Sequence, residues 1–150
     1  MKTLKKIGLV LAVVLGLGMV TGCDSLATLG MDELTYNDIM QNAYTPQDWV
    51  YGNWEGTAKT NVYEITNTST KKTDSASDSY SVNASSTVGA LAFGNILGVI
   101  AETATSNDDG FSKVCANSAR THVIYYSQTE STDGNVKTRV CTTYDLKKTK

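Results

Sequence analysis

The sequence predicts an α+β fold, in which a small antiparallel sheet of about four strands carries an N-terminal helix and a glycine-rich apolar helix packed on it. Two β-rich stretches, 122–128 and 136–144, flank the pair Asp133-Gly134, and such an arrangement is typical of a β-hairpin. Aromatic and β-branched residues in 49–66 predict another strand. The uncharged stretch 88–101 is long enough for a helix and too apolar for a loop.

The N-terminus has the layout of a secretory signal peptide. Residues 1–6 contain three lysines and no acid, and residues 7–20 carry no charge. A membrane-spanning helix needs about 20 apolar residues, whereas this stretch is shorter and is followed by polar residues from Asp24. We therefore expect a signal peptide that is cleaved, not a permanent span.

The four residues Val20-Thr21-Gly22-Cys23 resemble the lipobox of bacterial lipoproteins. The resemblance implies that a diacylglycerol is attached to the Cys23 thiol, that cleavage follows before this residue, and that its new amino group can be acylated. Two or three acyl chains anchor a protein stably, at about 0.8 kcal/mol per buried methylene. The expected organisation is a signal peptide over 1–22, a lipidated tether over 23–30 and one globular domain over 31–150. An ordinary signal peptide that ends near a cysteine is the alternative.

Asp24 directly follows the lipidated cysteine. Lipoproteins of the enterobacterial type use Asp at this position to avoid transfer to the outer membrane. The resemblance therefore implies retention at the inner membrane, facing the periplasm. Anchoring at the outer membrane is the alternative, because Ser25 weakens the resemblance.

Charge and length limit the partners. Removing 22 of the 150 residues leaves 128, which is enough for one domain with one core. The removed part contains three of the 13 basic residues and none of the 15 acidic residues, so the net charge becomes −5. Without a basic cluster the chain has no electrostatic reason to bind nucleic acid. Its expected partners are the membrane, through the lipid, and other envelope proteins.

Two further segments are predicted from local composition. In 31–44, Leu34, Ile39 and Met40 recur at roughly helical spacing before Pro46, which indicates one amphipathic helix. Residues 68–79 are almost wholly Ser, Thr, Lys, Asp and Ala, so we expect an exposed turn or mobile loop there.

The C-terminal hairpin has a predicted register. Asp133 and Gly134 are the expected loop residues, and this register places Tyr125 opposite Thr142. One face of the hairpin then carries side chains that we expect to point inward: Val123, Tyr125, Val140 and Tyr144.

The chain has three cysteines, and the lipid uses Cys23. Exported compartments oxidise thiols, so we expect Cys115 and Cys141 to form one disulfide, which would stabilise the fold by about 3 to 4 kcal/mol. A pair of free thiols is the alternative.

The stretch 88–101 has two interpretations. Ala90, Gly94 and Gly98 are four residues apart, so on a helix they line one stripe that another backbone can approach closely. The first interpretation is a buried helix packed against the sheet. The second is membrane insertion, or self-association through the stripe. The stretch is short for a membrane span, which favours the first.

Few residues could support catalysis. His122 is the only histidine, which excludes a metal site with two histidines. A nucleophile pair of Cys115 and His122 would require an unbridged thiol and a third group that orients the imidazole. Residues 107–110 resemble part of a calcium loop, but no Glu follows at the required distance, so a turn is expected. We expect no enzyme activity, no metal site and no cofactor.

Gly52-Asn53-Trp54 is similar to the Gly-x-Trp start of lipocalins, in which the Trp closes the base of the barrel and an Arg packs over it. Arg139 is the residue that could take the place of that Arg. The chain departs from the lipocalin pattern in its apolar helix and its few strands, since such a barrel takes about eight. We expect a non-catalytic envelope protein with a structural or accessory role. The alternative is a small lipocalin-like module that binds an apolar ligand or lipid.

Overall fold

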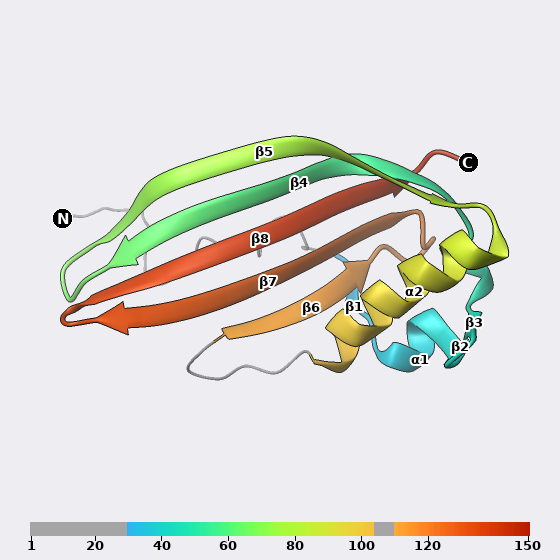
Figure 1. The fold of residues 1–150 in the computed structure, drawn as a ribbon, viewed down its shortest axis with the longest axis horizontal. Coiled ribbons are helices and arrows are strands. Elements are labelled where there is room, and N and C mark those ends of the chain that lie inside the picture. Colours follow the sequence, from blue (N-terminus) through green and yellow to red (C-terminus); the bar gives the residue numbers. More distant parts are fainter. Residues whose placement is uncertain (1–29, 104–109) are drawn as a thin grey trace.

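The computed structural model describes residues 30–103 and 110–150. A long twisted sheet dominates it, with the helix α2 lying over one end (Figure 1). Strands contain 59% of the described residues and helices 20%. The fold is therefore predominantly β, and the predicted α+β class is wrong.

The elements follow one another as β1 (Asp32–Glu33), α1 (Tyr36–Ile39), β2 (Met40–Asn42), β3 (Thr45–Pro46), the 3-10 helix η1 (Asp48–Val50), β4 (Gly52–Ile65), β5 (Thr70–Ala84), α2 (Thr87–Glu102), β6 (Gly110–Ala116), β7 (His122–Asp133) and β8 (Val136–Lys148). Six strands form one antiparallel sheet in the order β1-β6-β7-β8-β4-β5, and β2 pairs separately with β3. The last strand of the chain, β8, thus joins the hairpin β4–β5 to the meander β6–β7–β8.

The helix predicted over 31–44 is reduced to the single turn of α1. Thr35 and Asp38 form a capping box, in which the Thr35 backbone N–H and hydroxyl donate to the Asp38 carboxylate at 2.8 and 2.9 Å. These hydrogen bonds lower the pKa of Asp38. The helix ends at Ile39, because Met40 is extended and begins β2. The apolar residues that suggested a longer helix are buried all the same, but by one turn and short strands.

The loop predicted over 68–79 is also wrong, because most of it belongs to β5. The side chains of this strand are exposed from Thr70 to Ser79, so this part of β5 adds almost no apolar surface to the core, whereas Ala84 at its end is buried. Its backbone pairs along the whole length of β4. Lys71 and Lys72 lie on this outer strand, and charged residues are typical of a sheet edge that must not pair further.

The predicted C-terminal hairpin is formed by β7 and β8, but its register is shifted by two residues. The loop is Gly134-Asn135, and Asp133 pairs with Val136. Gly134 has a φ of +61°, which glycine adopts without strain in a two-residue hairpin loop. Tyr125 therefore lies opposite Tyr144 instead of Thr142, and their rings stack at 4.5 Å. A shift of two keeps each side chain on its face, so the inward orientation of Val123, Tyr125 and Tyr144 is retained.

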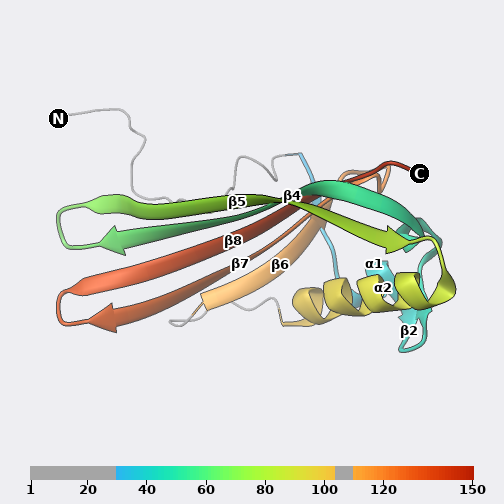
Figure 2. The same cartoon turned by 45° about the horizontal axis from the view of Figure 1, so that its top comes forward.

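The sheet has two distinct faces. The helix face is the one that α2 covers, and its buried side chains include Trp54, Val114, Val123, Tyr125 and Leu146. Side chains alternate along a strand, so the intervening residues point to the other side, which we call the opposite face. These include Cys115, Ile124, Tyr126, Cys141 and Thr143. Figure 2 shows α1 and α2 together on the helix face.

Candidate interaction surface

The helix α2 has a defined start and end. The Ser86 hydroxyl accepts a hydrogen bond from the Gly89 N–H at 3.0 Å, which satisfies one of the free donors of the first turn. At the other end the Thr103 hydroxyl donates to the Val99 carbonyl at 2.9 Å. No residue of α2 before Glu102 is charged.

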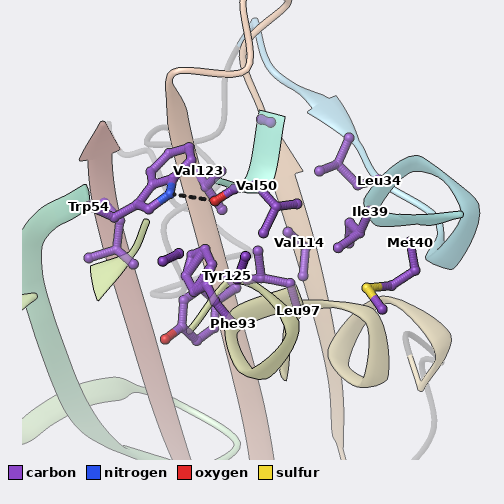
Figure 3. Close-up of a cluster of buried hydrophobic side chains, with 14 residues drawn as sticks. Leu34, Ile39, Met40, Val50, Trp54, Phe93, Leu97, Val114, Val123 and Tyr125 are labelled. Carbon is purple, nitrogen blue, oxygen red and sulfur yellow. Dashed lines mark hydrogen bonds between the residues drawn. The ribbon is translucent and has the colours of Figure 1, made fainter. Parts of the chain in front are cut away.

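One side of α2, the inner side, is packed into the core. Its buried residues are Ala90, Phe93, Gly94, Leu97 and Gly98. A Cβ atom on Gly94 would lie 2.8 Å from the Met40 sulfur and 3.2 Å from the Pro46 Cβ, so a larger residue here would force these side chains to shift. Figure 3 shows Phe93 and Leu97 pointing into the cluster around Val114 and Tyr125. The buried-helix interpretation is confirmed for this side.

The other side of α2, the outer side, is apolar as well, but it is exposed. Val88, Ile96 and Val99 are 79%, 51% and 56% exposed. Ala92 and Asn95 lie between them and are also exposed. The remaining large apolar side chain that is exposed among the described residues is Tyr44, in the turn between β2 and β3. The helix is therefore buried on its inner side only, and its outer side presents an apolar surface to the solvent.

The cysteines do not behave as predicted. Cys23 lies outside the described residues, so the lipid attachment stays a prediction. Cys115 is a free, buried thiol, and Cys141 is not free, but Cys115 is not its partner.

The sheet explains why these two cysteines do not meet. β7 lies between their strands, and Cys115 is level with Asp145, four residues beyond Cys141. Two strand spacings and a rise of four residues separate the Cα atoms by about 16 Å, whereas a disulfide needs less than about 7 Å. The predicted disulfide between Cys115 and Cys141 is absent from this fold.

The two conditions for a cysteine nucleophile are met, yet the thiol is not activated. Cys115 is unbridged, and His122 Nε2 lies 2.6 Å from Asp145 Oδ1, so a third group does orient the imidazole. However, Cys115 is only 3% exposed, and burial raises the pKa of its thiol despite the nearby charge of Lys113. No hydrogen bond joins it to His122, although both are described residues. A buried neutral thiol without a base is a core residue, not a nucleophile.

The arrangement expected from lipocalins is not formed. Trp54 lies on the helix face and donates its indole N–H to the Val50 carbonyl at 3.1 Å. Arg139 is opposite Tyr63, nine residues farther along β4, and points to the opposite face. The cation over the Trp54 ring is Lys148, whose Nζ lies 5.1 Å from the ring centroid. No local sequence pattern predicts this pairing, because it depends on the register of β4 and β8.

Arg139 has a structural role at the β7–β8 hairpin. Its guanidinium lies 2.7 Å from the carboxylate of Glu130, the residue opposite it on β7. Burial alone would raise the pKa of Glu130, but Arg139 and Lys137 outweigh this effect and the pKa is lowered.

Other site types have little support in the described part of the chain. A depression of about 620 Å³ beside β4 and β5 is wide open and lined by Glu55, Gly56, Ser79, Tyr80, Ser81 and Thr149. Within residues 30–103 and 110–150, no group of three or more His, Cys, Asp or Glu is placed to hold a metal ion. None of the helices in these ranges has the length and apolar character to cross a bilayer. Most of 107–110 lies outside the described residues.

No protein family, curated protein or solved structure matches this chain. The interpretation of its function therefore rests on its own residues, and the exposed outer side of α2 is the candidate site.

Proposed function

We propose that this chain is a non-catalytic lipoprotein of the bacterial cell envelope, anchored through Cys23, which binds another envelope protein with the outer side of α2. The signal-peptide layout and the lipobox support the anchor. One observation supports the binding surface: three large apolar side chains on one side of a helix, Val88, Ile96 and Val99, are more than half exposed.

Burial of this surface would stabilise a complex. Removing apolar area from water contributes about 25 cal/mol per Å², or about 1 kcal/mol for each of these partly exposed side chains. Contiguous exposed apolar surface of this kind marks interaction sites in soluble domains.

A protein partner fits the outer side of α2 better than a lipid surface does. Helices that lie in a membrane interface combine an apolar side with Lys and Arg on the polar side. α2 contains no basic residue, and its inner side is occupied by the core. After removal of 1–22 the net charge of −5 also opposes binding to anionic lipids.

The anchor is tested by Cys23→Ser. Because the thiol accepts the lipid, we expect this variant to accumulate as unprocessed precursor and to lose all labelling by a fatty-acid analogue. Labelling that persists would contradict the lipid anchor.

Sucrose-gradient fractionation of the labelled wild type tests the role of Asp24 in membrane choice. We expect the protein to cofractionate with inner-membrane markers. Recovery only with outer-membrane markers would show that the retention rule does not apply to this chain.

The binding surface is tested by site-specific photo-crosslinking in intact cells. A photoreactive residue at Val99 should capture one defined envelope protein, whereas the same residue at Ser77, which is exposed on β5, should not. The capture should disappear when Ile96→Asp is added. Capture of lipid alone at Val99, or equal capture at both positions, would contradict the proposal.

A further inference from the structure

The hairpins β4–β5 and β7–β8 extend beyond α2 (Figures 1 and 2). We call this part of the sheet the hairpin half, and it comprises residues 58–65, 70–78, 110–114, 125–133 and 136–144. Side chains alternate along each strand, so the cross-strand register assigns each charged residue of the hairpin half to one of the two faces. The two faces carry opposite net charge.

The opposite face of the hairpin half is basic. Its charged residues are Lys59, Lys72, Lys113, Lys137, Arg139 and Glu130. Five positive charges and one negative charge leave a net charge of +4. The basic residues come from four strands and are scattered between positions 59 and 139, so the sequence itself contains no basic cluster.

The helix face of the hairpin half is acidic. Its charged residues are Lys71, Glu64, Asp74, Asp78 and Asp133, which leave a net charge of −3. Lys71 and Lys72 are neighbours on the edge strand β5, yet Lys71 is level with Glu64 and Lys72 with Tyr63, so the two lysines belong to different faces. Protection of a sheet edge requires charge, but it does not require this difference in sign between the faces.

The positive charges of the opposite face are accessible. Lys59 and Lys72 are exposed, and within residues 30–103 and 110–150 neither of them forms an ion pair. The Lys137 ammonium and the Arg139 guanidinium lie 3.3 and 2.7 Å from the same carboxylate, that of Glu130. One negative charge cannot neutralise both, so a positive potential remains on this face.

We propose that the opposite face of the hairpin half binds the anionic headgroups of the membrane to which the chain is tethered, and that this contact turns the outer side of α2 away from the membrane. The orientation rests on the proposed lipid anchor at Cys23. The separation of charge between the two faces does not depend on the anchor.

Charge complementarity supports an anionic lipid surface as the occupant. Each Lys or Arg near such a surface strengthens binding by about fivefold. Lys59 and Lys72 alone would therefore favour this face by about 25-fold. The net charge of −5 after removal of 1–22 does not prevent the contact, because salt screens charges over about 8 Å and the nearest face dominates.

The extent of the basic surface also fits a bilayer. The five strands β6, β7, β8, β4 and β5 span about 19 Å across the sheet and the hairpin half about 25 Å along it, so several headgroups can be contacted at once. The helices α1 and α2 lie on the other face (Figure 2). The outer side of α2 would then face the periplasm, where a protein partner can reach it.

The first experiment measures which face lies nearer to the headgroups. The lipidated protein is inserted into liposomes that carry a headgroup quencher and consist of phosphatidylcholine, with or without phosphatidylglycerol. A fluorescent amino acid replaces Ser77 or Ala76, adjacent exposed residues of β5 on the opposite face and the helix face, respectively. With phosphatidylglycerol we expect quenching at Ser77 to be at least about twofold stronger than at Ala76.

The same difference should vanish in phosphatidylcholine alone, and also in about 1 M NaCl, where charges are screened within about 3 Å. Equal quenching at the two positions in anionic liposomes, or stronger quenching at Ala76, would overturn the proposal. A difference that persists in phosphatidylcholine would show that charge does not orient the protein.

The second experiment compares two double charge reversals with the same net charge. Lys59→Glu combined with Lys72→Glu should abolish the quenching difference between Ser77 and Ala76. Lys71→Glu combined with Lys150→Glu should preserve it, because Lys71 is on the helix face and Lys150 lies outside the hairpin half. All four lysines are exposed, so the melting temperatures should stay unchanged. The same outcome in both double variants would overturn the proposal.

Flotation of the wild type separates this proposal from the lipid anchor. A protein that floats with both kinds of liposome but shows no quenching difference keeps its anchor and loses the orientation. A protein that floats only with anionic liposomes contradicts the anchor and supports the basic face, and one that floats with neither contradicts both. A photoreactive residue at Ser77 that captures a second copy or another protein, and not lipid, would show a different occupant and overturn the proposal.

Discussion

The two sides of α2 come from one uninterrupted apolar stretch but have opposite environments. The inner side contains Gly94 and Gly98, where an added Cβ atom would lie 2.8 Å from the Met40 sulfur and 3.1 Å from the Tyr36 ring, respectively. The outer side carries Ile96 and Val99, which are more than half exposed. Large apolar side chains occur on both sides, since Phe93 and Leu97 are buried, whereas the stripe of Ala90, Gly94 and Gly98 lies on the packed side only. The comparison teaches that small residues at a spacing of four mark where this helix meets its own chain, while apolar character alone does not show which side is packed.

The largest expected effect is on the inner side. Gly94→Leu would push a side chain against Met40, Pro46 and Val50, and overpacking of this kind costs about 3 kcal/mol of unfolding free energy. Urea denaturation of the lipidated protein in mild detergent measures the change. The control is Asn95→Leu, which adds the same side chain at the next, exposed position and should alter stability by less than about 0.5 kcal/mol. An equal loss of unfolding free energy in Gly94→Leu and Asn95→Leu would show that the two sides of α2 are not packed differently.

An intermediate loss of unfolding free energy is expected at the N-terminal cap of α2, which supports both sides of the helix. Ser86→Ala removes the side-chain cap of the Gly89 N–H and should lower the unfolding free energy by about 1 kcal/mol. Thr87→Ala, at the adjacent exposed position, is the control and should be nearly neutral. Because the cap supports the helix rather than either side of it, photo-crosslinking from Val99 should persist in Ser86→Ala. If the cross-link from Val99 disappears in Ser86→Ala, binding at the outer side requires the full stability of α2 and not only its exposed side chains.

Sequence patterns predicted the elements that have local signals, and missed those that depend on pairing between distant segments. The turn around Gly134 and the apolar stretch of α2 are local, and both were found. The polar side chains of 68–79 predict a loop, but the edge strand β5 needs only backbone hydrogen bonds to its neighbour. The sequence pairs Cys115 with Cys141, because nothing local shows that β7 lies between them.

The sequence predicts the packed side of α2 but not the exposed side that forms the candidate site. The spacing of Ala90, Gly94 and Gly98 identified the inner side of α2 correctly. It could not show that the remaining apolar residues stay uncovered, because that depends on how many layers pack around the helix. The sheet, α1 and the β2–β3 hairpin cover only one side of α2, which leaves Val88, Ile96 and Val99 in the solvent.

The smallest expected change in stability is also the most informative. Ile96→Asp places a carboxylate where the side chain is already half exposed, so the charge stays in water and the unfolding free energy should change by less than about 0.5 kcal/mol. Leu97→Asp is the matched control at the next position, where the side chain is fully buried and an unpaired charge should prevent stable folding. Thermal unfolding at two protein concentrations separates the outcomes. If Ile96→Asp is as damaging as Leu97→Asp and the wild-type melting temperature rises with concentration, a second copy of the chain covers the outer side in solution. If Ile96→Asp is damaging but the wild-type melting temperature does not change with protein concentration, the outer side is packed within the molecule. The comparison between the two sides of α2 then fails.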